Sequence, residues 1–381
     1  MFSPLSFSSE AKNLGEKISF EDDTVGDGFV SFQIKQSTTS FHFTINTCFQ
    51  PSLNTSQKHS TFHIINNVGD IFPRSLKGHC DMKNSIKISM LGGDLRQLAV
   101  AKRLALRYDN IKLWGIRSEL FENTEGVTLS DELSEAISES RAVILPLPAT
   151  TDGATLNAPL ADIAQRPKLS LIAKIIPKDA TVIGGRLPDS FVSALQRSDI
   201  KVIDYFHSED FQVKNAYTTA EAALSIAMNA LDRNIRGANI AITGYGRISK
   251  HLCSLLLAMG AHVTVAARKD SDLAFASSYG CHTLKIDPSG TWLAPLRSGY
   301  DVIYNTVPHW IFDRDFLEKT PKSTVIVELA SAPGGVDICA AKELGANVIW
   351  GSSLPGKYAP RSAGELIGDC IDKIISEEVV P

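Results

Sequence analysis

Residues 239–268, NIAITGYGRISKHLCSLLLAMGAHVTVAAR, decide how the second half of this chain folds. Five residues of apolar strand lead directly into Gly244 and Gly246, and an amphipathic helix then ends at Gly260. A second strand at 262–266 completes a βαβ unit with a glycine turn at its first strand–helix junction. The turn lets the backbone approach a pyrophosphate, beside the unpaired N–H groups and positive dipole of the helix N-terminus. The predicted dinucleotide-binding residues here are Gly244, Tyr245, Gly246, Arg247 and Ile248.

Two positions depart from the usual pattern of such a unit. Ser249 stands where a third Gly or Ala is common, although a small hydroxyl can still fit where helix and strand pack closely. Arg268, followed by Lys269, stands where an Asp or Glu would accept the ribose 2′-hydroxyl. A guanidinium suits a 2′-phosphate instead, so we expect NADP. NAD remains the alternative if Arg268 is only a surface residue at a strand end.

The composition is that of a globular protein with room for two domains. The chain has 381 residues, 44% of them hydrophobic and 21% charged, with a net charge of −4. This balance argues against nucleic acid or an anionic membrane as a partner. Six scattered cysteines show neither a CxxC pair nor metal-ligand spacing, which is typical of a reducing cytosol. No apolar run approaches the roughly 18 residues that span a bilayer.

Residues 1–81 differ from the rest of the chain. They are rich in Ser, Thr, Asn, Gln and Phe and have no sustained period of a helix or strand. Met82 stands just before a regular strand pattern. We therefore expect the natural product to start at or near Met82, and residues 1–81 to be a disordered tail or a non-native leader.

From Met82 onward, strands alternate with helical segments. The predicted strands of the first domain, 82–214, are 86–91, 111–115, 142–147, 181–184 and 201–205. A long helix at 215–236 follows, with Thr218 and Glu221 as a capping box. The second domain, 237–352, adds strands at 300–306, 324–329 and 347–350. This order predicts an α/β protein of two open parallel-sheet, Rossmann-like domains joined by a long helix, with a C-terminal helix.

Ligands of such sheets bind beyond the carboxyl ends of the strands. In the second domain this places four further cofactor candidates at the end of a strand, although they could equally act as its cap: Asn305, Thr306, Val307 and Pro308. In the final segment, 353–381, a loop at 354–364 enters a helix with Ser362 and Glu365 as a second capping box. Lys357 and Arg361 lie near that helix N-terminus and suit a substrate carboxylate, unless Glu365 already uses the dipole.

Seven blocks, in this order and spacing, resemble the family of the dipicolinate synthase A subunit, known from spore-forming bacteria. They are ISMLGGDLRQ (88–97), VILPLPATT (143–151), NAYTTAE (215–221), GYGR (244–247), NTVP (305–308), ELASAPGGVD (328–337) and LPGKYAPRSAG (354–364). The resemblance covers about 82–376. It implies oxidation of dihydrodipicolinate to dipicolinate with a nicotinamide cofactor, a second, flavoprotein-like subunit, and action in the mother cell during sporulation. A homo-oligomer is also expected.

That reaction needs orientation of the ring and a grip on two carboxylates more than a strong nucleophile. Arg96 is the leading carboxylate ligand, because a guanidinium matches a carboxylate in two bonds, and Arg361 and Lys357 are second. The plausible neutral donors, each of which could instead stabilise a loop, are Gln97, Thr150, Thr151 and Asn215. No general acid or base can be named.

Two other readings stay open. One is another two-domain dehydrogenase resembling alanine dehydrogenase or methylenetetrahydrofolate dehydrogenase. The other is a non-catalytic nucleotide-binding subunit whose flavoprotein partner carries out the chemistry. Fold analogy alone does not separate them.

Overall fold

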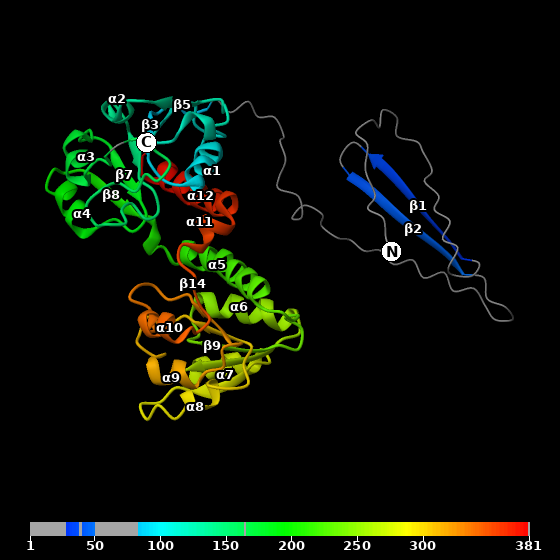
Figure 1. The fold of residues 1–381 in the computed structure, drawn as a ribbon. Helices are drawn as coiled ribbons and strands as arrows, with labels where there is room; N and C mark the ends of the chain where they lie inside the picture. Colours follow the sequence, from blue (N-terminus) through cyan, green and yellow to red (C-terminus); the bar gives the residue numbers. More distant parts are fainter. Residues whose placement is uncertain (1–27, 38–39, 50–82, 164, 380–381) are drawn as a thin grey trace. The chain divides into compact units, whose positions relative to one another are not determined.

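The computed structural model describes residues 28–37, 40–49, 83–163 and 165–379, and the chain divides into two units, 1–79 and 80–381. In the first unit, β1 (Gly28–Ser37) and β2 (Ser40–Phe49) pair antiparallel, with Ser37 opposite Ser40 (Figure 1). Most of the predicted leader, 1–81, lies outside the described residues, so its status stays a prediction.

The second unit contains two parallel six-stranded sheets, in the orders β5-β4-β3-β6-β7-β8 and β11-β10-β9-β12-β13-β14. Numbered within its own domain, each sheet has the order 3-2-1-4-5-6, which is that of a dinucleotide-binding fold. Helices cover the sheets in both domains, and α5 lies where the chain passes from one to the other (Figure 1). The predicted fold class, two Rossmann-like α/β domains, is confirmed.

The first sheet has helices on both faces because successive side chains of its strands point to opposite faces. Its strands are β3 (Ile88–Leu91), β4 (Ile111–Trp114), β5 (Val127–Ser130), β6 (Ala142–Ile144), β7 (Thr181–Gly184) and β8 (Lys201–Asp204). Ile88 and Met90 pack in one core with α1 (Leu95–Leu104) and α12 (Pro360–Glu378). Leu91 and Val143 pack in the other, with α2 (Leu133–Ile137), α3 (Leu169–Ile175) and α4 (Asp189–Gln196).

The second sheet repeats this arrangement. Its strands are β9 (Asn239–Thr243), β10 (His262–Ala267), β11 (His282–Lys285), β12 (Val302–Asn305), β13 (Val325–Glu328) and β14 (Val348–Trp350). Ile240 and Ile242 face a core shared with α6 (Arg247–Ala258), while Ala241 faces the opposite core. The remaining helices are α7 (Asp270–Ser278), α8 (Leu293–Leu296), α9 (Arg314–Lys319) and α10 (Ile338–Leu344).

Helix α5 (Glu209–Ala230) belongs to both domains. Phe211 lies in the core of the first domain, and Ile226 lies in the core of the second. The predicted range, 215–236, began and ended too late, and the predicted capping box was wrong, because Thr218 and Glu221 lie in mid-helix. The helix is rich in alanine and buried on several sides, so its true start has no strong amphipathic signal.

The C-terminal helix α12 returns to the first domain and packs on α1. A Cβ added at Gly364 would collide with the carbonyl oxygen of Arg96, so glycine permits this close approach of two helices. The segment before it is a short helix, α11 (Leu354–Tyr358), rather than a loop. The second predicted capping box was also wrong: Ala359 is the N-cap of α12, and Glu365 bonds Arg361 instead of a helix amide.

In the second unit, two strands, β5 and β11, have no counterpart among the predicted ones. Both are edge strands, and β11 is exposed at three of its four residues. Each is only four residues long and has at most two apolar residues, so it leaves a weak pattern in the sequence. In the part of the chain that the structure describes, no helix is both long and apolar enough to cross a bilayer.

Candidate functional site

The glycine turn between β9 and α6 leaves the N-terminus of α6 open. Gly244 has φ +88°, and a Cβ there would lie 2.5 Å from Thr306 Oγ1 and 3.0 Å from Val307 Cγ2. Gly246 is the N-cap of α6, at φ −83°, and no side chain caps the helix. A Cβ at Gly246 would meet no atom within 4 Å. The residues present therefore fit a pyrophosphate, which needs free amides and room for close approach.

Ser249 has a defined role in this turn. It is fully buried, and its hydroxyl lies 3.0 Å from the hydroxyl of Thr306, which in turn donates to the Thr243 carbonyl over 2.7 Å. Because Thr306 uses its proton on Thr243, Ser249 is the donor between the two hydroxyls. The serine thus ties α6 to the loop after β12, where a glycine would only have allowed close packing.

A buried carboxylate that the sequence analysis did not select, Glu328, organises the carboxyl ends of three strands. Its side chain is fully buried and accepts from Asn305 Nδ2 at 3.0 and 2.9 Å and from the amides of Ala330 and Gly335, both at 2.8 Å. Asn305 Oδ1 accepts from Thr243 Oγ1 at 2.6 Å. The only sequence signal was an acidic residue ending the apolar run Val-Ile-Val, at 325–327.

The predicted cofactor residues differ in whether protein groups already occupy their side chains. The polar atoms of Asn305 bond protein groups, so that side chain stabilises the strand ends. Val307 and Thr306 border Gly244, and Pro308 is exposed beside them. Tyr245 is largely buried, which raises the pKa of its hydroxyl to about 12, and Ile248 is half-buried.

The two arginines of this set differ in their pairing. Arg247, the first residue of α6, bonds Glu209, the first residue of α5, with Nε 2.8 Å from Oε1. This bond lowers the pKa of Glu209. Arg268 is exposed just after β10 and has no hydrogen-bond or ion-pair partner among the described residues. A free guanidinium at that strand end has the chemistry to receive a phosphate.

In the first domain, Arg96 lies where the strand order reverses, between β3 and β6. Its Nε donates to Asp94 Oδ1 at 2.9 Å and its Nη2 to Oδ2 at 2.8 Å, and Nη2 also donates to the Leu147 carbonyl. Asp94 also caps α1 by accepting from the Arg96 amide at 3.0 Å. Arg96 is 7% exposed, whereas the side chain of Asp94 is 31% exposed, so the pair is half-buried. Nε and Nη2, which together could have bound a carboxylate, are therefore already occupied. Nη1 is the nitrogen left for a ligand.

Two buried polar atoms near this pair have no partner within the described ranges. They are Nε2 of Gln97 and the hydroxyl of Tyr205, in side chains 4% and 2% exposed. Gln97 was predicted as a substrate donor, and an unused buried donor supports that prediction. Tyr205 was not predicted. Burial raises the pKa of its hydroxyl well above the usual range, so the group is a neutral donor.

The other predicted substrate residues lie at the same domain's loops and on α5. Thr150 Oγ1 donates to Asp152 Oδ1 at 2.9 Å, in a turn where Asp152 also accepts from Thr155 and Ala154. These bonds, led by the one from the Thr155 hydroxyl, hold the pKa of Asp152 far below its usual range. Thr151 is exposed. Asn215 is half-buried on α5, and its side chain makes no hydrogen bond to the described residues.

The two predicted cations of the C-terminal segment are exposed. Lys357 Nζ lies 3.2 Å from Ser352 Oγ, and Arg361, with a side chain 88% exposed, bonds Glu365 Oε1 at 2.9 Å. Gly356, in contrast, contacts the Arg96–Asp94 pair: a Cβ there would be 2.9 Å from Arg96 Nε. Thus α11 brings its backbone to Arg96, while Lys357 and Arg361 are held at the surface.

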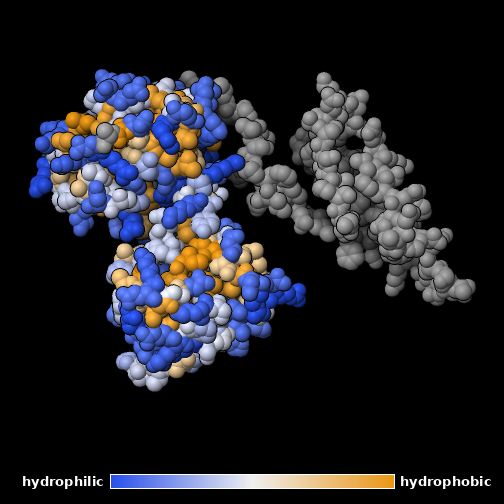
Figure 2. Space-filling model, in the orientation of Figure 1, coloured by the Kyte–Doolittle hydropathy of each residue, from blue (hydrophilic) through white to orange (hydrophobic). Residues whose placement is uncertain are grey.

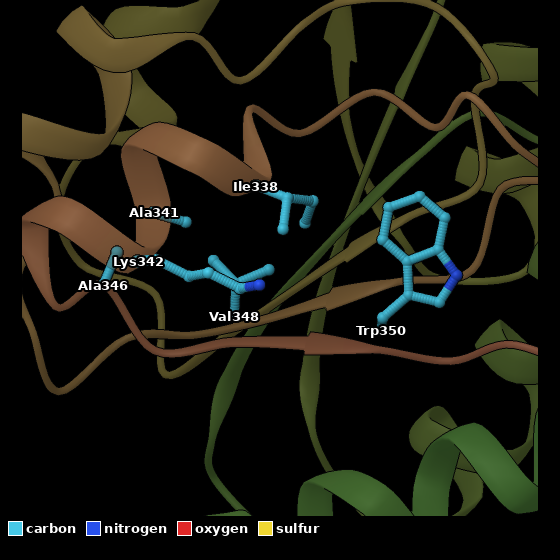
Figure 3. Close-up of a pocket in the computed structure, with 6 residues that line it drawn as sticks. All are labelled: Ile338, Ala341, Lys342, Ala346, Val348 and Trp350. Carbon is cyan, nitrogen blue, oxygen red and sulfur yellow. The ribbon is translucent and has the colours of Figure 1, made fainter.

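A separate apolar cavity of about 350 Å³ lies between α10 and β14. In Figure 3, Ile338, Ala341 and Lys342 come from the helix, and Val348 and Trp350 from the strand. Since β14 is an edge strand, three positions from β9, this cavity is distinct from the glycine turn. No group of His, Cys, Asp and Glu residues in the described part of the chain is arranged to hold a metal ion.

Comparison with known proteins agrees with this architecture. The family model described as the N-terminal domain of the dipicolinate synthase A subunit matches residues 87–206. The A subunit of dipicolinate synthase from Bacillus subtilis (strain 168) is 26% identical over 296 residues, which are 78% of this chain and 98% of that protein. The resemblance seen in the sequence motifs is therefore confirmed.

Two solved structures extend the match to three dimensions. The A chain of dipicolinate synthase from Bacillus subtilis superposes with a TM-score of 0.67 at 25% identity, covering 78% of this chain and 97% of that one. The corresponding dipicolinate synthase chain from Bacillus halodurans gives the same TM-score and identity, covering 77% and 99%. The similarity thus extends over both α/β domains.

Proposed function

We propose that this protein is a nicotinamide-dependent oxidoreductase that converts dihydrodipicolinate to dipicolinate. The observation that carries the proposal is its similarity to the dipicolinate synthase A subunit across 98% of that protein, including both domains. The open N-terminus of α6, with Gly244 and Gly246 before it, supplies the cofactor site that this chemistry requires.

A nicotinamide bound at the N-terminus of α6 would supply the acceptor for a hydride from the substrate ring. The ring also gives up one proton, and the product is an aromatic pyridine, so aromaticity drives the step. The protein has to hold the ring in place and neutralise two carboxylates. We assign this to Arg96 through Nη1 and to Gln97 through its unused Nε2. Further proposed contacts are Thr150, Thr151, Asn215, Lys357 and Arg361.

We assign the cofactor as NADP, with NAD as the alternative. The support is Arg268, which is exposed after β10 and unpaired within the described residues. At this position a carboxylate would select the ribose hydroxyl of NAD, and a cation favours a phosphate. The nicotinamide and its ribose would lie along the loop of Thr306, Val307 and Pro308.

We also propose a second subunit, as the name of the relative implies. From the sequence resemblance we propose that it is flavoprotein-like and that the protein acts in the sporulation mother cell. A homo-oligomer is supported by apolar surface over α5 and α6 (Figure 2), where Tyr217, Met228 and Met259 are exposed. Light scattering on the purified chain tests the oligomer, and co-purification tests the second subunit.

The deciding experiment is incubation of the full chain with freshly generated dihydrodipicolinate and each nicotinamide, alone and with the second subunit. We expect absorbance at 340 nm and the pyridine product to rise together. Cofactor binding without product under every pairing would favour a non-catalytic nucleotide-binding subunit. Turnover of alanine or of a methylenetetrahydrofolate, but not of dihydrodipicolinate, would assign another dehydrogenase activity.

A further inference from the structure

Arg186 adopts a backbone conformation that side chains other than glycine rarely take. It follows β7 and Gly185 at the carboxyl edge of the first sheet, with φ +56°. The left-handed region costs a residue with a Cβ roughly 1–2 kcal/mol. One carboxylate holds the turn: Asp204 accepts from the amides of Arg186 at 3.1 Å and Leu187 at 2.8 Å. Such strain, retained at a strand end, is typical of functional positions.

The guanidinium of Arg186 is available to a ligand. The residue is exposed, and its Cζ lies 5.5 Å from the centroid of the Phe206 ring. Unlike Arg96, Arg247 and Arg361, it has no carboxylate partner in the described portion of the chain. Stacking on an aromatic face orients an arginine while leaving its N–H groups free.

Gly185, which directly precedes Arg186, contacts the loop that bonds Arg96. The Gly185 carbonyl accepts from the Ala149 amide at 3.1 Å, in the loop whose Leu147 carbonyl bonds Arg96. A Cβ at Gly185 would lie 2.7 Å from the Leu147 side chain. The turns after β6 and β7 are therefore in direct contact, and neighbouring strands of a sheet are about 4.8 Å apart. Both arginines belong to the same edge of the sheet.

We propose that Arg186 binds one carboxylate of a dicarboxylate substrate, while Arg96 and Gln97 bind the other. This proposal rests on the proposed function, since it assigns a second cation to the second carboxylate of the diacid. It also accounts for an arginine, rather than a glycine, at a left-handed position next to Gly185. A monocarboxylate would use only half of this pair of sites.

The test exploits the backbone strain. Arg186→Gly removes the cation but accepts φ +56° without cost, so the fold should be at least as stable. Asp199→Gly is the matched control, because Asp199 is also exposed with φ +56°, before β8 at the opposite end of the sheet. In the full chain, calorimetry would give Kd for pyridine-2,6-dicarboxylate, pyridine-2-carboxylate and the cofactor, and kinetics would give KM for dihydrodipicolinate.

We expect Arg186→Gly to weaken the dicarboxylate about 10- to 100-fold, in Kd and KM alike, as loss of a charge-assisted hydrogen bond would. Cofactor Kd should stay within about twofold, Arg186→Lys should retain part of the affinity, and Asp199→Gly should change nothing. Unchanged dicarboxylate affinity in Arg186→Gly overturns this role while the oxidation stands. Arg186-dependent binding without oxidation by the unaltered chain, either alone or with the second subunit, supports the role and overturns the reaction. No dicarboxylate binding by the unaltered chain overturns both.

Discussion

Gly246→Ala separates binding of the cofactor from stability of the fold. Gly246 has φ −83°, a value open to alanine, and the added methyl group would meet no protein atom within 4 Å. Alanine is a poorer N-cap than glycine, but it also reduces the entropy of the unfolded chain. These effects oppose each other, so the free energy of unfolding should change by no more than about 1 kcal/mol. The methyl group instead occupies the space in front of the amides of α6.

Gly244→Ala is the contrasting variant at the same turn. At φ +88° alanine would cost roughly 1–2 kcal/mol in the backbone. Its methyl would also lie 2.5 Å from Thr306 Oγ1, which cannot withdraw without losing its bond to the Thr243 carbonyl. We add about 1–2 kcal/mol for that lost bond and the clash. A total near 2–4 kcal/mol should lower Tm by several degrees, at about 2–4 °C per kcal/mol.

Differential scanning calorimetry and titration with NADP and NAD would measure the two variants. We expect Gly246→Ala to keep the Tm of the unaltered protein within about 3 °C while its cofactor Kd rises at least about tenfold, or roughly 1.4 kcal/mol. Gly244→Ala should lose stability as well as affinity. A Gly246→Ala protein that binds both cofactors with unchanged Kd would refute a pyrophosphate at the N-terminus of α6.

Three further outcomes are expected. Arg268→Asp should shift the ratio of NADP to NAD affinity toward NAD by about tenfold or more, because a carboxylate repels the 2′-phosphate; an unchanged ratio would remove Arg268 from cofactor choice. Glu328→Gln should lower the free energy of unfolding by about 1–3 kcal/mol, because one acceptor oxygen becomes an amide donor that faces buried donors. Chemical denaturation would measure this loss, and unchanged stability would mean that the fold does not need the buried network. Gly364→Ala should cost roughly 1–3 kcal/mol and more than Gly368→Ala, since its methyl would lie 2.4 Å from the Arg96 carbonyl oxygen, whereas that of Gly368 would lie 2.8 Å from Cβ and Cγ of Arg103; equal losses would contradict the close helix contact.

Much of the fold follows from local patterns in the chain. The strands at Asn239–Thr243 and Thr181–Gly184 were predicted with their observed bounds, because short apolar runs between turn residues have few alternatives. The glycine turn was predicted equally well, since a tight turn and an open helix N-terminus each need a residue without a side chain. The edge strands β5 and β11 were missed, because each has only four residues and at most two apolar side chains.

The pairing of distant side chains was decided by the tertiary structure alone. Arg96 bonds Asp94, which is only two residues away, but its other partner is the carbonyl of Leu147, which the neighbouring strand β6 brings near. In the sequence, Glu328 is only the residue that ends an apolar strand. The structure shows that Asn305 and the amide of Gly335 donate hydrogen bonds to it.

By itself, then, the sequence determined two α/β domains, the position of the dinucleotide turn and the resemblance to the dipicolinate synthase A subunit. It could not determine that the C-terminal helix packs on α1, where Arg103 bonds Asp369 from 266 positions away. Helix and strand periods record which face of an element is buried, whereas the partner on that face depends on how all elements close around one core. Whether each arginine is paired or free therefore depends on the tertiary structure.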